Sequence, residues 1–238
     1  DGASVGHAFP RRTHQPRNRS CATQPFRYTQ RSPSGIAAQK RRNDMNYNLV
    51  KFTMSAGTAQ QLPKPGRPEI AFVGRSNVGK SSLMNKLFGR KDLVKVSSKP
   101  GKTTTINFFA IGNVDFVDLP GYGFARVNAT EQERWNNLME GYFEGERNLK
   151  LVVALVDIRH DASPLDLQMI GYLESLGLPY CVAFTKADKF SRSKGLTQAA
   201  MLRKQFELEP EIPWVLVSST AGTGIGDLKD TIERALRK

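Results

Sequence analysis

The chain has 238 residues, of which 39% are hydrophobic, and it carries a formal net charge of +13. This length fits one domain of ordinary size with appendages and excludes a multidomain assembly. The sequence holds no run of about 20 apolar residues, which excludes a membrane-spanning helix. The two cysteines, Cys21 and Cys181, stand far apart, which argues against a disulfide framework and favours a reducing compartment. We therefore expect a soluble, cytoplasmic protein that does not insert into a membrane.

The first 44 residues differ in composition from the rest. They hold nine Lys and Arg residues against Asp1 and Asp44 and show no apolar periodicity, so we expect residues 1–44 to form a disordered basic tail. Their Arg-rich, acid-poor composition fits an organellar presequence. Alternatively, because Met45 opens the first stretch of folded character, the tail is an upstream extension that is not part of the mature protein, and we favour this second interpretation.

Residues 45–68 form an N-terminal lead-in that ends in a Gly- and Pro-rich connector, and residues 69–238 form the main domain. Strands are predicted at 69–74, 106–112, 114–119, 149–158, 178–185 and 214–218, and helices at 78–88, 130–143, 164–177 and 224–238. Their alternation predicts an α/β fold with a doubly wound, mostly parallel six-stranded sheet and helices on both faces. One strand, near residues 106–112, is predicted to be antiparallel, and the ligand is expected at the carboxyl ends of the strands.

The loop between the first predicted strand and helix fits the pattern GxxxxGK[ST]. Glycines let such a loop curl until its amides point at phosphate oxygens, and the following helix directs the positive end of its dipole there. We expect Lys80 to reach the β- and γ-phosphates and the hydroxyl of Ser81 to bind Mg²⁺. The residues predicted to hold a nucleotide in this loop are Gly74, Arg75, Ser76, Asn77, Val78, Gly79, Lys80 and Ser81.

A second motif, Asp118-Leu119-Pro120-Gly121, follows an apolar strand, where a carboxylate can hold Mg²⁺ beside the phosphate loop. An Asp-x-x-Gly turn by itself commonly ends a strand. With the phosphate loop upstream, we interpret Asp118 as a metal ligand, often through water, and the Gly121 amide as a contact for the γ-phosphate. Lys80 and Gly121 are therefore candidates for the catalytic set.

A third motif, Thr185-Lys186-Ala187-Asp188, ends the next-to-last predicted strand. The Asp188 carboxylate can accept two hydrogen bonds from guanine, from ring N1 and the exocyclic amine, whereas adenine offers no such donor pair. This favours GTP and GDP as ligands over those of an ATP-dependent enzyme. The stem of Lys186 can cover the base. The turn after the last strand places a backbone amide near guanine O6 and consists of Val217, Ser218 and Ser219.

These motifs occur in the order that Ras-like GTPases use, and the surrounding sequence resembles one family. The segments FVGRSNVGKSSLMNKL, SSKPGKTTTINFF, VDLPGYGFARV and FTKADKFSRS are similar to those of the EngB/YihA/YsxC family, small bacterial P-loop GTPases of the TRAFAC class. The resemblance runs from about Phe52 to Leu236 and does not cover residues 1–44. It implies a Ras-like G domain that hydrolyses GTP with Mg²⁺ and acts in large ribosomal subunit assembly and in cell division and septation.

The resemblance also implies a third metal ligand. The family places a Mg²⁺-binding threonine in a Pro-Gly-basic-Thr stretch, which here implies Thr103 beside Ser81 and Asp118, and adds Thr103 to the catalytic set. The residues alone leave three neighbouring hydroxyls of equal chemistry open. The nucleotide-contacting residues expected in this stretch are Gly101, Lys102, Thr103, Thr104 and Thr105.

Hydrolysis in Ras-type GTPases depends on a Gln directly after the Asp-x-x-Gly motif, which orients the attacking water. This chain has Tyr122 at that position, so we predict slow intrinsic hydrolysis. Two sources of compensation for the absent Gln remain open. Asn77 stands where potassium-activated relatives coordinate a monovalent ion, so K⁺ is one candidate for supplying positive charge; the other is that a ribosomal partner completes the site.

The predicted partner is the large ribosomal subunit or its precursor, contacted by a monomer through ribosomal RNA and protein. Basic residues near the nucleotide edge are candidates for contacts with RNA phosphates. The alternative function is a nucleotide-gated scaffold in septation whose hydrolysis is incidental. The basic residues are Lys95, Lys99, Lys102, Arg126, Lys189, Arg192 and Lys194.

Overall fold

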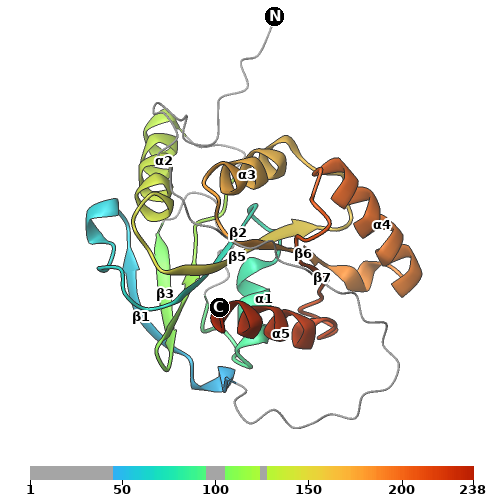
Figure 1. The fold of residues 1–238 in the computed structure, drawn as a ribbon, viewed down its shortest axis with the longest axis horizontal. Coiled ribbons are helices and arrows are strands. Elements are labelled where there is room, and N and C mark those ends of the chain that lie inside the picture. Colours follow the sequence, from blue (N-terminus) through green and yellow to red (C-terminus); the bar gives the residue numbers. More distant parts are fainter. Residues whose placement is uncertain (1–44, 95–104, 124–127) are drawn as a thin grey trace, which may run out of the picture.

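The structure, a computed structural model, describes residues 45–94, 105–123 and 128–238. In these ranges seven strands form one sheet, with α2, α3 and α4 on one face and α1 and α5 on the other (Figure 1). None of the helices so described is long and apolar enough to cross a membrane. The strands are β1 (Lys51–Ala56), β2 (Glu69–Gly74), β3 (Ile106–Ile111), β4 (Val114–Asp118), β5 (Leu149–Asp157), β6 (Tyr180–Thr185) and β7 (Trp214–Leu216). The α-helices are α1 (Lys80–Leu87), α2 (Ala129–Phe143), α3 (Pro164–Ser175), α4 (Arg192–Gln205) and α5 (Ile225–Leu236).

The strands follow the order β1-β3-β4-β2-β5-β6-β7 across the sheet. Strands β4, β2, β5, β6 and β7 run parallel, whereas β3 is antiparallel to both of its neighbours, β1 and β4. The predicted doubly wound, mostly parallel sheet with an antiparallel strand near residues 106–112 is therefore confirmed. The predicted number of six strands is wrong, because β1 adds a seventh at the edge beside β3.

Two elements lack a marked pattern in the sequence. Strand β1 lies at the edge of the sheet and fully buries only its last residue, Ala56, so no apolar run precedes that point. Helix α4, which the sequence analysis does not predict, buries Gly195, Ala199 and Leu202, and two of these side chains are too small to mark a helical face. The other predicted strands and helices begin and end within two residues of their observed bounds.

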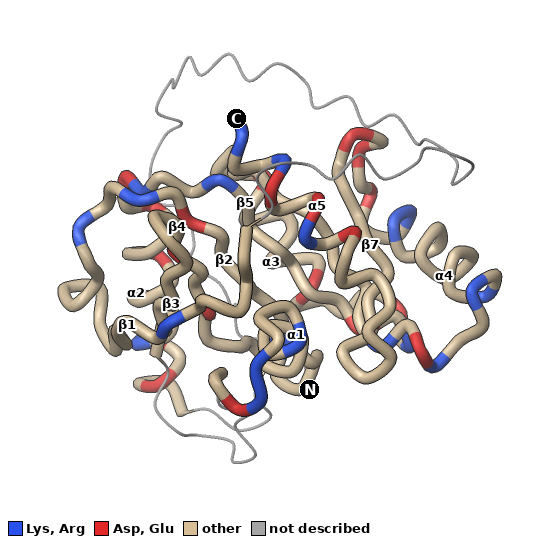
Figure 2. The backbone as a smooth tube through the Cα atoms, turned by 90° about the horizontal axis from the view of Figure 1, so that it is seen from below, with Lys and Arg blue, Asp and Glu red and all other residues tan. Residues whose placement is uncertain are grey.

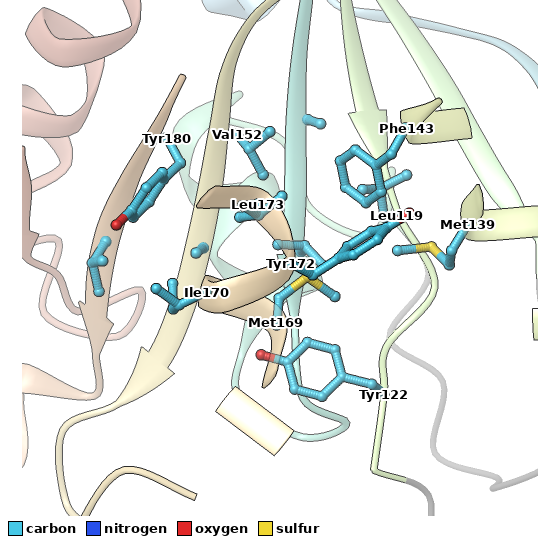
Figure 3. Packing of buried hydrophobic residues seen from close by; sticks show 14 of the residues in the cluster. Leu119, Tyr122, Met139, Phe143, Val152, Met169, Ile170, Tyr172, Leu173 and Tyr180 are labelled. Atoms are coloured by element: carbon cyan, nitrogen blue, oxygen red, sulfur yellow. The ribbon is translucent and has the colours of Figure 1, made fainter. Parts of the chain in front are cut away.

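Apolar clusters fill both faces of the sheet. The cluster under α2, α3 and α4 includes Met139 and Met169, and Figure 3 shows Tyr122 at its margin. The cluster on the opposite face joins α1 and α5 to the sheet through Met84 and Ile232. Strands β2 and β6 and most of β5 are buried, as expected for strands covered by helices on both sides.

Residues 45–68, the lead-in of the sequence analysis, pack against this same sheet. Tyr47 is buried in the cluster with α1 and α5. Arg147 donates a hydrogen bond to the Pro63 carbonyl at 3.1 Å, and its Nε lies 2.8 Å from Oε2 of Glu69 at the start of β2. The Glu69 and Arg147 side chains are 2% and 5% exposed, so they form a buried ion pair at the edge opposite the carboxyl ends of the strands.

Candidate functional site

Residues 74–81 connect β2 to α1 in a tightly curled loop. Asn77 and Gly79 have φ of 65° and 101°, in the left-handed region that Asn and Gly adopt most readily. A Cβ at Gly74 would lie 2.9 Å from Val78 Cγ1 and 3.1 Å from the Leu155 carbonyl oxygen, so only glycine fits where this loop crosses β5. Gly79 provides no side-chain cap for α1, which leaves amides at the start of this helix facing the loop.

Lys80 and Asp118 meet directly at the carboxyl ends of β2 and β4. The Lys80 ammonium forms an ion pair with Asp118 Oδ1, and the two side chains are 11% and 8% exposed. The second carboxylate oxygen of Asp118 accepts from Asn107 Nδ2 at 3.4 Å, and Asn107 Oδ1 accepts from the Ser55 hydroxyl of β1 at 2.6 Å. The edge strand β1 is therefore connected to the carboxylate through Asn107, a residue that the sequence analysis does not single out.

The donors at this point suit a hard divalent cation. Mg²⁺ prefers oxygen ligands, and the Asp118 carboxylate ends β4 while Ser81 lies in the first turn of α1, directly after Lys80. Thr105 is described, and its hydroxyl donates to Asn107 Oδ1 at 3.4 Å. The remaining residues of that predicted stretch, Gly101, Lys102, Thr103 and Thr104, lie outside the described residues.

The segment after Asp118 is hydrogen-bonded to the phosphate loop. Ser76 donates to the Tyr122 carbonyl from its amide at 2.8 Å and from its hydroxyl at 3.2 Å, and the Tyr122 amide donates to the Gly74 carbonyl at 3.4 Å. A Cβ at Gly121 would lie 3.2 Å from the Ser76 hydroxyl oxygen, so the two loops pass very close to each other at this point. Leu119 and Pro120, between Asp118 and Gly121, are both buried.

The Tyr122 side chain is directed into the core. It is 4% exposed, and its hydroxyl donates to Asp166 Oδ1 of α3 at 2.9 Å. Burial and the neighbouring Asp166 raise the pKa of the Tyr122 hydroxyl well above its ordinary value, so the hydroxyl remains a neutral donor. Tyr122 therefore cannot orient a water molecule at the phosphate loop in this arrangement.

The loop after β6 joins the phosphate loop from the other side. The Thr185 hydroxyl donates to the Val78 carbonyl at 2.8 Å, and Lys186 Nζ donates to the Asn77 carbonyl at 2.9 Å and to Asp157 Oδ2 at 2.8 Å. Burial favours the neutral form of Asp157, but hydrogen bonds from Arg159 and Lys186 outweigh it and hold the pKa of this carboxyl below its usual range. Asp157, the last residue of β5, therefore stays ionised and holds Lys186.

Asp188 is positioned by the turn after β7. Its Oδ1 accepts a hydrogen bond of 2.6 Å from the hydroxyl of Ser218, which is fully buried. That hydrogen bond lowers the pKa of Asp188. The Ala187 amide donates to the Val217 carbonyl at 3.1 Å, which fixes the two loops to each other. Ser219, the next residue of the turn, is half-buried. The residues of the described motifs thus lie together at the carboxyl-terminal edge of the sheet, where the parallel strands end.

The known proteins that this chain resembles are GTPases and GTP-binding proteins. A family model described as "50S ribosome-binding GTPase" matches residues 69–186. A probable GTP-binding protein EngB of Geobacillus kaustophilus is 45% identical over 181 residues, which cover 76% of this chain and 93% of that relative. A probable EngB of Bacillus subtilis is 42% identical over 195 residues, covering 82% of this chain and 100% of the relative. The crystal structure of a probable GTP-binding protein engB matches with a TM-score of 0.60 at 29% identity, over 71% of this chain and 98% of that one.

The curled loop with Lys80, the carboxylate of Asp118 beside it and the Asp188 loop define a P-loop GTPase, a class that binds GTP and generally hydrolyses it. Within that class, identities above 40% over nearly the full length of two relatives establish the family of this chain. The chain belongs to the EngB family of GTP-binding proteins. The resemblance stated from the sequence is confirmed.

Proposed function

We propose that the chain binds GTP and GDP with Mg²⁺ at this edge of the sheet and acts as a slow, nucleotide-dependent switch in assembly of the large ribosomal subunit, with an accompanying role in cell division and septation. The observation that carries the nucleotide part is the set of direct contacts among the three loops. The Lys186 ammonium donates a hydrogen bond to the phosphate loop, and the Ser218 hydroxyl donates one to Asp188. Lys80 forms an ion pair with Asp118. A phosphate site and a guanine site are thereby held at a defined separation.

Each residue has a separate role in binding. The amides of residues 74–81 and the Lys80 ammonium bind phosphate oxygens, and the Asp188 carboxylate accepts hydrogen bonds from guanine. Ser81, Asp118 and, by family resemblance, Thr103 hold Mg²⁺, which when bound neutralises charge on the β- and γ-phosphates. The Gly121 amide faces the γ-phosphate, which is present in GTP and absent from GDP.

Slow hydrolysis follows from the position of Tyr122. Its side chain is buried against α3, so the residue at the position of the water-orienting Gln of Ras-type GTPases is held away from the phosphate loop. We infer low intrinsic turnover, raised by K⁺ at Asn77 or by the ribosomal partner. Single-turnover hydrolysis with and without large subunits measures this directly.

The ribosomal part rests on the family and on surface charge. The matching family model is described as ribosome-binding. Helix α4 has no Asp or Glu, and Figure 2 shows its basic residues at both ends. Lys189, Arg192 and Lys194 are exposed next to the guanine-binding loop, and residues of this type supply the salt-dependent contacts of proteins with RNA phosphates. Lys95, Lys99, Lys102 and Arg126 lie outside the described residues.

Co-sedimentation with purified ribosomal subunits tests the ribosomal part. The chain is loaded with the β,γ-imido analogue of GTP or with GDP at near-physiological salt. Retention on the large subunit only with the analogue is expected. A variant with Arg192 and Lys194 replaced by Gln, which leaves the Lys189–Asp188 ion pair in place, should weaken retention but keep nucleotide affinity. Absence of retention of the unmodified chain in both states would overturn the assembly role and favour the nucleotide-gated scaffold in septation.

A further inference from the structure

Asp166 lies in the first turn of α3 and belongs to no motif of the nucleotide site. Although 44 residues separate it from Tyr122 along the chain, its carboxylate accepts a hydrogen bond from the Tyr122 hydroxyl. Its side chain is nearly fully buried. One carboxylate oxygen accepts the Tyr122 hydroxyl at 2.9 Å, and the other accepts the Ser163 hydroxyl at 2.6 Å and lies 4.0 Å from Nη1 of Arg75. Arg75 belongs to the phosphate loop, so Asp166 contacts both loops of the γ-phosphate side.

The segment 121–123 is therefore held from two directions. Its backbone is bonded to Ser76 and Gly74 of the phosphate loop. Its one large side chain, Tyr122, is fixed to α3 through the buried hydroxyl. At the far end, a Cβ at Gly123 would lie 3.0 Å from Leu165 Cδ1, so α3 also packs against the backbone there. Figure 3 shows the Tyr122 ring extending along the margin of the core next to α3.

We propose that Asp166 is a positioning residue for GTP recognition: by holding the Tyr122 hydroxyl, it fixes the adjacent Gly121 amide at the place where the γ-phosphate binds. The inference rests on the proposed nucleotide site and deepens it. Gly121 is the residue before Tyr122, so a rotation of the tyrosine backbone moves the Gly121 amide with it. A hydrogen bond to a buried carboxylate is among the stronger neutral-to-charged contacts in proteins. The position of the amide therefore depends on a residue that does not touch the nucleotide.

This arrangement predicts an effect on GTP that GDP does not share. GDP has no γ-phosphate, so its affinity does not depend on the Gly121 amide. Loss of the anchor should lower the affinity for the GTP analogue and the turnover of GTP, while the affinity for GDP stays near its original value. A purely structural role for the Tyr122–Asp166 pair would lower both affinities together.

The chain offers a matched control. The Tyr142 hydroxyl also donates to a buried carboxylate, Glu69 Oε2, at 2.9 Å, but this pair lies at the opposite edge of the sheet. Tyr122→Phe and Tyr142→Phe thus each remove one oxygen atom and one buried hydrogen bond of the same kind. Urea unfolding of both variants shows whether their losses of stability are comparable.

The experiment measures affinity for the β,γ-imido analogue of GTP and for GDP by titration calorimetry with Mg²⁺. Tyr122→Phe and Asp166→Ala should each lower the ratio of the two affinities about tenfold, the effect of one hydrogen bond to a charged group. Asp166→Asn, which retains an acceptor oxygen, should recover most of the ratio, and Tyr142→Phe should leave it unchanged.

Two results would overturn the inference in distinguishable ways. If the unmodified chain binds neither guanine nucleotide, the proposed function fails and the positioning role fails with it. If the unmodified chain binds both and Tyr122→Phe keeps the original ratio, or lowers both affinities equally, the nucleotide site stands and the positioning role is wrong.

Discussion

The Lys186 ammonium donates a hydrogen bond of 2.9 Å to the backbone carbonyl of Asn77, so the guanine-binding loop holds the phosphate loop directly. Both residues have left-handed backbone angles, with φ of 60° at Lys186 and 65° at Asn77. Such angles cost on the order of 1–2 kcal/mol at residues other than glycine. The contact between the two side-by-side loops offsets part of this cost and joins the base site to the phosphate site.

Lys186→Met removes this contact and the pairing with Asp157 while it keeps an apolar stem for the base. Because the phosphate loop binds the phosphates common to both nucleotides, we expect affinity for GTP and GDP to fall together by about tenfold. Titration calorimetry measures both, with Lys204→Met on α4 as a control that removes an exposed ammonium. Unchanged affinities in Lys186→Met would show that the bond between the loops has no role in binding.

Asp188→Asn exchanges an acceptor for a donor at the guanine edge. We expect GTP affinity to fall about a hundredfold, because two hydrogen bonds from guanine lose their charged acceptor. Affinity for XTP should rise, since xanthine presents an oxygen where guanine has its exocyclic amine. Competition of XTP and GTP against a fluorescent nucleotide measures the exchange of preference. Retained preference for GTP would mean that Asp188 does not contact the base.

The fold and the loops of the site could be predicted from local patterns. A nearly continuous apolar run marks β5, and the spacing of glycines and Lys80 marks the phosphate loop before any coordinates are known. Edge strand β1 could not be found in this way, because its exposed residues leave no apolar run. Helix α4 leaves little signal in the sequence for a related reason, since its small buried residues give weak periodicity.

The supporting residues of the site depend on contacts that no local pattern encodes. Asn107 contacts Asp118 from the neighbouring strand, and Asp157 holds Lys186 from 29 residues away. The sequence predicts only a backbone amide of the Ser218–Ser219 turn near the base, whereas in the structure the Ser218 hydroxyl donates a hydrogen bond to Asp188. A polar residue at the end of a buried strand, such as Asp157, is the one signal in the sequence that could have pointed to such a partner.

The buried Glu69–Arg147 pair allows a prediction about stability alone. Arg147→Met leaves the Glu69 carboxylate buried without its cation and should lower the free energy of unfolding by about 3–5 kcal/mol. The double variant Glu69→Gln/Arg147→Met should lose less, because no buried charge is left unpaired. Urea unfolding of both variants measures the difference. Equal losses in the single and double variants would contradict this account, and nucleotide affinity of the folded fraction should stay unchanged.

Tyr142 links stability to alkaline pH. Burial and the adjacent Glu69 raise the pKa of its hydroxyl well above the ordinary value, so the folded chain keeps a proton that the unfolded chain releases near pH 10. The contribution of this protonated hydroxyl to the free energy of unfolding is fully present below pH 10. It is lost as the pH rises above 10, by about 1.4 kcal/mol per pH unit. Between pH 9 and 11, the free energy of unfolding measured in urea should therefore fall by about 1.4 kcal/mol less in Tyr142→Phe than in the unmodified chain. Parallel pH profiles of the two chains would refute it.

Potassium dependence is the prediction that bears most directly on turnover. Asn77 is exposed on the phosphate loop, whereas the side chain of Tyr122, at the position of the water-orienting Gln of Ras-type GTPases, is buried and bonded to Asp166. A monovalent cation held at Asn77 would add positive charge where negative charge develops during hydrolysis. We expect about tenfold faster turnover of GTP in K⁺ than in Na⁺ at equal ionic strength, with GDP affinity the same in both salts. Asn77→Ala should remove the difference, and equal rates of the unmodified chain in K⁺ and Na⁺ would leave the ribosomal partner as the source of the missing catalytic contribution.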